Sequence, residues 1–101
     1  MIKHIVLFKL ADNAEGKNKQ ENATIIKKQL EDLKNVIPEI KNIKVDINHE
    51  NADQDNYDII LDTEFDSFDD LAIYANHPDH LKVGEYVKKV RISRAAIDYE
   101  L

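Results

Sequence analysis

The apolar residues of this 101-residue chain recur with two periods, and the order in which those periods alternate most restricts its fold. Alternation with a period of two is typical of a strand, whereas steps of three and four are typical of a helix. Strand-like segments lie at 2–10, 43–47, 57–65 and 91–101. Helix-like segments lie at 18–37, 67–75 and 78–90. No linker, tandem repeat or low-complexity tract divides the chain, so we expect a single domain over residues 1–101.

The ends of the helical segments carry residues that suit those positions. Pro38 is expected to end the first helix, because proline cannot continue it. Ser67 can cap the second helix, and Pro78 suits the first turn of the third, with His77 at its cap. The order of elements is β-α-β-β-α-β with a broken second helical region. It predicts an α+β, ferredoxin-like fold in which an antiparallel sheet carries its helices on one face.

Apolar residues occupy both faces of the predicted strands. The helices of a ferredoxin-like fold cover one face only, and an antiparallel sheet with a wet second face should alternate apolar and polar residues. We therefore expect a homodimer through the second face of the sheet, and the protomers would form a dimeric α+β barrel. The residues expected between protomers are Ile5, Leu7, Ile60 and Ile97.

Charge and cysteine content exclude several classes of function. The formal net charge of −6 opposes general nucleic-acid binding, because an acidic surface repels phosphate. The absence of cysteine excludes disulfides, thiolate metal sites and cysteine nucleophiles. His77 and His80 lie too close in sequence to close a zinc site without a distant ligand, and Asp66, Asp69 and Asp70 are better suited to the start of a helix. We predict no metal and no cofactor.

The first strand also bears on location. Its apolar stretch is too short to span a membrane, and no small-residue cleavage site follows it. We expect a cytoplasmic protein without membrane contact.

Three segments together resemble the stress-responsive A/B barrel (Dabb) family over essentially the whole chain. They are the opening Ile2-Lys3-His4-Ile5-Val6-Leu7-Phe8-Lys9, then Tyr57-Asp58-Ile59-Ile60-Leu61 with Glu64-Phe65, and Tyr74-Ala75-Asn76-His77-Pro78-Asp79-His80 with Val90 and Asp98-Tyr99. The His-Pro-x-His element is the most specific part. The resemblance implies ferredoxin-like protomers that pair into a dimeric barrel.

The resemblance also implies candidate site residues. A few plant members of the family are polyketide cyclases that perform an aldol condensation without a cofactor, and their catalytic His and Tyr correspond to His80 and Tyr74. Their first-strand cavity His corresponds to His4. Their third-strand His is replaced here by Ile59, a departure that makes the expected pocket more apolar.

Each candidate also has a structural explanation. His80 can act as a base near neutral pH or bond a backbone carbonyl as a buried side chain. Tyr74 can donate to an enolate oxygen or serve as a core aromatic residue. His4 can line a pocket or be a satisfied core histidine. The expected ligand-binding residues are His4, Val6, Phe8, Ile59 and Leu81.

The predicted function is that of a Dabb protein of unassigned activity, with a small pocket for an apolar or phenolic ligand. One alternative is a cofactor-free cyclase or isomerase that uses His80 and Tyr74. Others are a monooxygenase-like relative, because such enzymes share this barrel, and a purely structural stress protein.

Overall fold

The computed structural model describes residues 1–101, and its main elements follow the predicted order. The sheet strands are β1 (Ile2–Leu10), β4 (Asn42–Ile47), β5 (Ile59–Phe65) and β6 (Arg91–Glu100). The helices are α1 (Lys19–Asp32), α2 (Phe68–Asn76) and α3 (Pro78–Val90). The α+β, ferredoxin-like prediction is confirmed.

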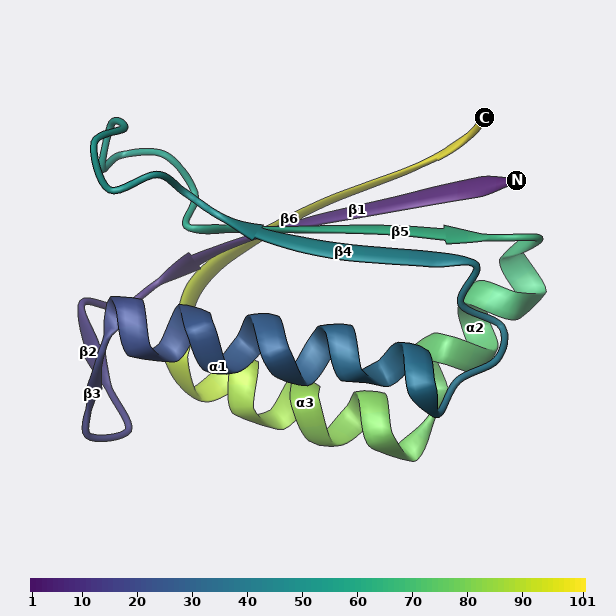
Figure 1. Ribbon diagram of the computed structural model, residues 1–101, viewed down its shortest axis with the longest axis horizontal. Coiled ribbons are helices and arrows are strands. Elements are labelled where there is room, and N and C mark those ends of the chain that lie inside the picture. Colours follow the sequence, from purple (N-terminus) through teal and green to yellow (C-terminus); the bar gives the residue numbers. More distant parts are fainter.

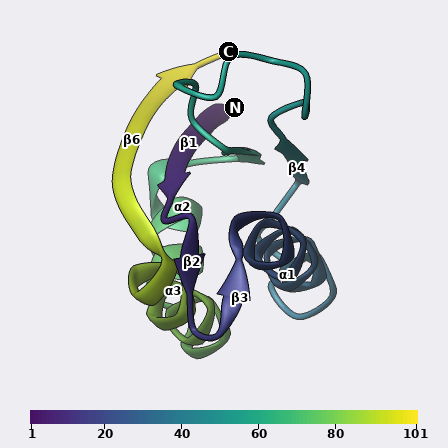
Figure 2. The same ribbon diagram turned by 90° about the vertical axis from the view of Figure 1, so that its left-hand side faces the viewer.

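The strands form an antiparallel sheet in the order β4-β5-β1-β6, so the first strand is central. Helices α1 and α3 lie side by side along one face of this sheet (Figure 1). Seen from the end, the strands curve over the helices and leave the opposite face uncovered (Figure 2). The chain ends meet where the Leu101 N–H donates to the Met1 carbonyl oxygen at 2.9 Å. The helices and the sheet thus enclose a single apolar layer.

Side chains fix the start of each long helix. The Asn18 side chain accepts from the Glu21 N–H while the Glu21 carboxylate accepts from the Asn18 N–H, a capping box at the start of α1. Ser67 caps α2 by accepting from the Asp70 N–H at 3.1 Å. At α3, His77 Nδ1 accepts from the Asp79 N–H at 3.1 Å. His77 is therefore the N-cap of α3, as the sequence predicted.

Two predicted boundaries differ from the structure, and one segment without a predicted element forms a hairpin. The first helix ends at Asp32, before Ile37, and its chain tightens into a 3-10 turn at Leu33–Asn35. Such a turn is common where an α-helix ends, and Pro38 then disfavours helical backbone at Ile37.

The polar segment before the first helix contains a small hairpin, β2 (Asn13–Ala14) and β3 (Lys17–Asn18). Glu15 and Gly16 turn it with positive φ angles of 51° and 73°. Two successive residues with positive φ give a turn whose twist matches that of the flanking strands, and glycine adopts positive φ without steric cost.

The third predicted strand begins at Ile59, and Tyr57 lies outside it. Its side chain is exposed and its hydroxyl lies 3.3 Å from Ser93 Oγ. The chain is held just after Tyr57, where the Asp58 N–H donates to the Phe8 carbonyl and the Asp58 carboxylate turns inward.

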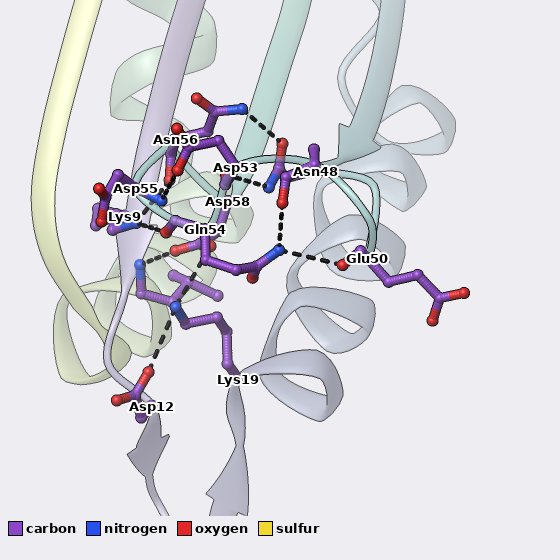
Figure 3. Close-up of polar contacts among 12 residues, drawn as sticks. Lys9, Asp12, Lys19, Asn48, Glu50, Asp53, Gln54, Asp55, Asn56 and Asp58 are labelled. Atoms are coloured by element: carbon purple, nitrogen blue, oxygen red, sulfur yellow. Dashed lines mark hydrogen bonds and ion pairs between the residues drawn. The ribbon is translucent and has the colours of Figure 1, made fainter.

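The connection between β4 and β5, residues 48–58, is rich in Asn, Asp and Gln, and we call it the polar loop (Figure 3). Lys9 Nζ donates to the backbone carbonyls of Gln54 and Asn56 at 2.7 and 2.6 Å. Asp58 is 4% exposed, and its Oδ2 accepts from the Leu10 N–H at 2.7 Å. Its Oδ1 lies 3.5 Å from Lys19 Nζ. The loop is therefore tied to β1 and to α1.

Candidate functional site

A cavity of about 380 Å³ lies between the sheet and the helices. It is bounded by β1, β5 and β6 on the sheet side and by α1, α2 and α3 on the helix side. A volume of this size is at the lower end of small-molecule sites. Five of the predicted residues line it: His4, Val6, Phe8, Tyr74 and His80.

Strand alternation places the first three of these residues. Successive side chains of a strand point to opposite faces, so His4, Val6 and Phe8 share the face that the helices cover. The backbone at His4 is also held from β5, because buried Thr63 Oγ1 donates to the His4 carbonyl at 2.8 Å. The position of the His4 ring is therefore set by rigid elements.

His4 is paired with a carboxylate from the neighbouring strand. Asp98 lies opposite His4 in the β1·β6 register, and His4 Nδ1 contacts Asp98 Oδ1. A carboxylate only accepts, so the neutral imidazole carries its proton on Nδ1 and leaves Nε2 as an acceptor. Both explanations offered for His4 therefore apply in part, because its side chain lines the cavity while its Nδ1 is hydrogen-bonded within the protein.

Tyr74 is the most deeply buried polar residue of the cavity wall. Its side chain is 1% exposed and packs against Phe65, with ring centroids 5.0 Å apart. The hydroxyl has no hydrogen-bond partner. Burial raises the pKa of the Tyr74 phenol well above its usual value, so the group stays protonated and can donate.

His80 packs against Tyr74 with ring centroids 4.4 Å apart. Its Nδ1 lies 3.1 Å from the Ala75 carbonyl oxygen, which can only accept. The Nδ1 therefore donates, and Nε2 keeps a free lone pair. Burial lowers the pKa of His80 below its usual 6.5 although the hydrogen bond to the Ala75 carbonyl opposes this change. Repulsion by Arg94, and by His4 and His77 in their charged forms, lowers the pKa of His80 further. His80 is accordingly a neutral base at pH 7.

These contacts assemble an acid–base end of the cavity. Four side chains from four elements meet there, namely His4 on β1, Tyr74 on α2, His80 on α3 and Asp98 on β6. The ring centroids of His4 and Tyr74 are 6.4 Å apart, so Tyr74 lies beside both histidines. Such an arrangement can remove a proton and stabilise the oxyanion that results.

The cavity wall contains neither Ile59 nor Leu81, although both were expected to bind the ligand. Ile59 is 1% exposed but belongs to the core, where it pairs with Phe8 and Ile47 at the start of β5. Leu81 is 52% exposed, because it follows His80 by one position and so lies about 100° away around α3.

Sequence reasoning missed the contribution of β6. Arg94 and Asp98 lie on the cavity side of this strand, at positions that pair with Phe8 and His4. Arg91 and Lys88 add two cations to the wall. The available signal was the alternation Arg94-Ala96-Asp98, which places charged residues on the face that β1 fills with apolar ones.

No group of three or more His, Cys, Asp or Glu side chains is arranged to hold a metal ion. No helix combines the length and the apolar character needed to cross a membrane.

Several solved structures are similar to this chain. A dimeric protein of unknown function with a ferredoxin-like fold from Bacteroides fragilis is 37% identical, with a TM-score of 0.87 over 99% of this chain and 95% of the other. A dimeric ferredoxin-like protein of unknown function from Thermobifida fusca is 27% identical, with a TM-score of 0.84 over 99% and 90%.

The fold also occurs in an enzyme. The hydroxynitrile lyase of Passiflora edulis is 18% identical, with a TM-score of 0.77 over 99% of this chain and 92% of the other. This likeness concerns the fold alone. A search of curated proteins gives no match. The model of the stress responsive A/B barrel domain matches residues 2–101, and the chain therefore belongs to the Dabb family.

Proposed function

We propose that this Dabb protein binds a small, mainly apolar ketone or phenol in the cavity and moves a proton on it without a cofactor. The observation that carries the proposal is the unpartnered Tyr74 hydroxyl beside the neutral His80 ring. An unsatisfied buried hydroxyl destabilises a fold by about 1–3 kcal/mol, so its presence in a cavity wall favours a ligand that completes it.

The chemistry needs two groups. His80 Nε2 takes a proton from a carbon next to the ligand carbonyl, and the electron pair of that C–H bond moves onto the carbonyl oxygen. Tyr74 donates a hydrogen bond to the enolate oxygen. Return of the proton to another atom gives an isomerase. Attack of the enolate carbon on a second carbonyl, with the proton passed from His80 to the new alkoxide, gives a cyclase. No electrons enter or leave in either case.

His4 and Asp98 act together at the acid–base end of the cavity. The Asp98 carboxylate orients His4 through Nδ1, so that Nε2 is the acceptor available to a ligand hydroxyl. Position 59 is an isoleucine and no β5 histidine lines the cavity, so His4 and His80 are the two histidines available at the acid–base end.

The test uses two probes that share an apolar body, 4-ethylphenol and 4-phenylbutan-2-one. We expect both to shift the ring protons of His80 in NMR spectra, and the protein to accelerate exchange of the ketone's α-hydrogens with D₂O. His80→Ala and Tyr74→Phe should abolish the exchange. His49→Ala is the matched control, because His49 is exposed in the polar loop.

Two results would contradict the proposal. One is that neither probe perturbs His80 while its ring titrates like a free imidazole. The other is exchange that survives in His80→Ala. The structural role would then be the better account.

We further propose that the protein is a homodimer through the uncovered sheet face. Ile97 is 61% exposed and Ile60 is 37% exposed on this face, and Ile5 and Leu7 are half-buried beside them. The dimeric state of the two bacterial relatives supports this assembly. Light scattering at micromolar concentration should give twice the protomer mass of 11.7 kDa.

A charge placed on this face tests the same proposal. Leu7→Lys should dissociate the dimer or unfold it, because an unpaired buried charge costs about 3–5 kcal/mol. A wild-type protein that scatters as a monomer would rule the assembly out.

A further inference from the structure

The end of the cavity opposite His80 and Tyr74 is basic, although the chain as a whole is acidic. The sequence contains only two arginines, Arg91 and Arg94, and both line this cavity. Lys88 lines the same end. We call these three residues the basic end. In a chain with a net charge of −6, their position in one cavity wall requires an explanation.

The topology separates the basic end from the acid–base end. Arg94 and Asp98 are four positions apart on one face of β6, which is about 13 Å at the rise of a strand. Lys88 and His80 are eight positions apart on α3, which is about 12 Å at the rise of a helix. Strand β6 follows α3 directly and runs back in the opposite direction (Figure 1), so the last residues of α3 and the first residues of β6 lie at the same end. Apolar side chains such as Val6, Val83 and Val87 line the wall between them.

No side chain of the protein neutralises the basic end. None of its three residues takes part in any of the ion pairs of the structure. The sole carboxylate in the cavity wall is Asp98, which His4 already engages. The Arg94 charge is felt as far as His80, whose pKa it helps to lower. The guanidinium groups are thus available to an anion that enters the cavity.

We propose that the ligand carries a carboxylate, bound by Arg94 together with Arg91, so that the protein takes aromatic or short alkyl carboxylic acids. Arginine offers a planar pair of N–H donors that match the two oxygens of a carboxylate. This inference deepens the proposed function, since it places the ligand's ketone or phenol at the other end, against Tyr74 and His80. An apolar body of about one aromatic ring with a short chain fits between the two ends.

The test compares 3-(4-hydroxyphenyl)propanoate with its methyl ester, using the Nε–H signals of the two arginines and the ring signals of His80. We expect the acid to bind at least tenfold more tightly than the ester and to shift the Arg94 signal. Arg94→Gln should abolish this preference. Arg94→Lys should retain part of it, because it keeps the charge but loses the planar fork.

Lys82→Gln is the matched control, because Lys82 is exposed on α3 and does not line the cavity. It should leave the preference unchanged, and thermal melting should show that all variants fold. Equal binding of acid and ester would overturn the carboxylate assignment. Shifts of Arg94 by inorganic phosphate as large as those by the acid would also overturn it.

The two proposals can fail separately. If 4-ethylphenol shifts His80 while the acid has no advantage over its ester, only the carboxylate assignment is wrong. If the acid shifts Arg94 while no compound shifts His80, only the proton-transfer function is wrong.

Discussion

Polar side chains gather in two regions of this protein, the polar loop and the cavity, and their hydrogen bonding differs. In the polar loop the side chains bond one another and the backbone, as Asn56 Nδ2 does with Asn48 Oδ1 and Gln54 Nε2 with the Ala52 carbonyl (Figure 3). In the cavity, Tyr74 has no partner and Arg94 has no counter-charge. A satisfied cluster holds its own chain in place, whereas an unsatisfied one is suited to another molecule.

Among the changes that test this comparison, the largest effect is expected where the polar loop is anchored. Asp58→Ala removes the acceptor of the Leu10 N–H and leaves Lys19 without its buried partner. We expect the free energy of unfolding to fall by about 3 kcal/mol, because the buried Leu10 N–H is left unpaired and Lys19 keeps only the exposed Asp12 as a partner. Urea denaturation measures this change.

Asp12→Ala provides the control, because Asp12 also lies near Lys19, at 3.4 Å, but its side chain is 91% exposed. That variant should lose less than about 1 kcal/mol. If the two losses were equal, the polar loop would not depend on the buried contact.

Two tyrosines, one with a hydrogen-bond partner and one without, allow the same comparison with a smaller expected change in stability. Tyr86 donates its hydroxyl hydrogen to Oδ1 of buried Asn22, whereas the Tyr74 hydroxyl has no partner. Tyr86→Phe should lower the free energy of unfolding by about 1–2 kcal/mol. Tyr74→Phe should leave it unchanged or raise it by up to about 1 kcal/mol, while weakening the binding of 4-ethylphenol. Urea denaturation and the ligand titration would contradict this if Tyr74→Phe destabilised the fold without affecting binding.

The smallest effect concerns pH at the cavity. The folded pKa of His80 is lowered from 6.5, so the unfolded chain binds more protons at this site between the two values. The contribution of His80 to stability is therefore complete above pH 6.5 and falls as pH decreases towards the folded value.

The charges near His80 that act on it are those of His4, His77 and Arg94, and they act in the same direction as burial. NMR titration should give a midpoint below 6.5, and His80→Gln should flatten the stability profile in that range. A midpoint above 6.5 would contradict the prediction, because it would mean that the folded protein favours the charged form of the His80 ring.

Much of the fold follows from local patterns. The alternation at Val6 and Phe8 indicates a strand, and Pro78 after a helix break indicates the start of a new helix. Both signals depend only on neighbouring residues, so the order of strands and helices was predicted correctly. The same alternation placed His4 on the cavity face. The resemblance to the Dabb family pointed to Tyr74 and His80, which the structure brings together.

What the sequence did not predict depends on long-range pairing. The contact of Asp98 with His4 requires the β1·β6 register, which neither strand specifies alone. Leu81 was expected on the cavity side of its helix, but successive residues of an α-helix point in directions about 100° apart, so the neighbour of His80 points away from the cavity. Ile59 lies on the face of β5 that the helices cover, and part of that face packs in the core while another part lines the cavity. Alternation along the strand identifies the face, but only the packing of the helices determines which of its residues line the cavity.

The central position of β1 has a consequence for how the chain reaches this structure. Its partners are remote in sequence, since Lys3 and Asp62 are 59 positions apart and His4 and Asp98 are 94. One long loop must close before this strand gains its first neighbour and a second before it gains both, and proteins dominated by such contacts fold slowly, in milliseconds to seconds. During that interval a strand with apolar residues on both faces has free edges, which invite pairing with other chains. Refolding yield should therefore fall as protein concentration rises, with β1 as the segment through which aggregation begins.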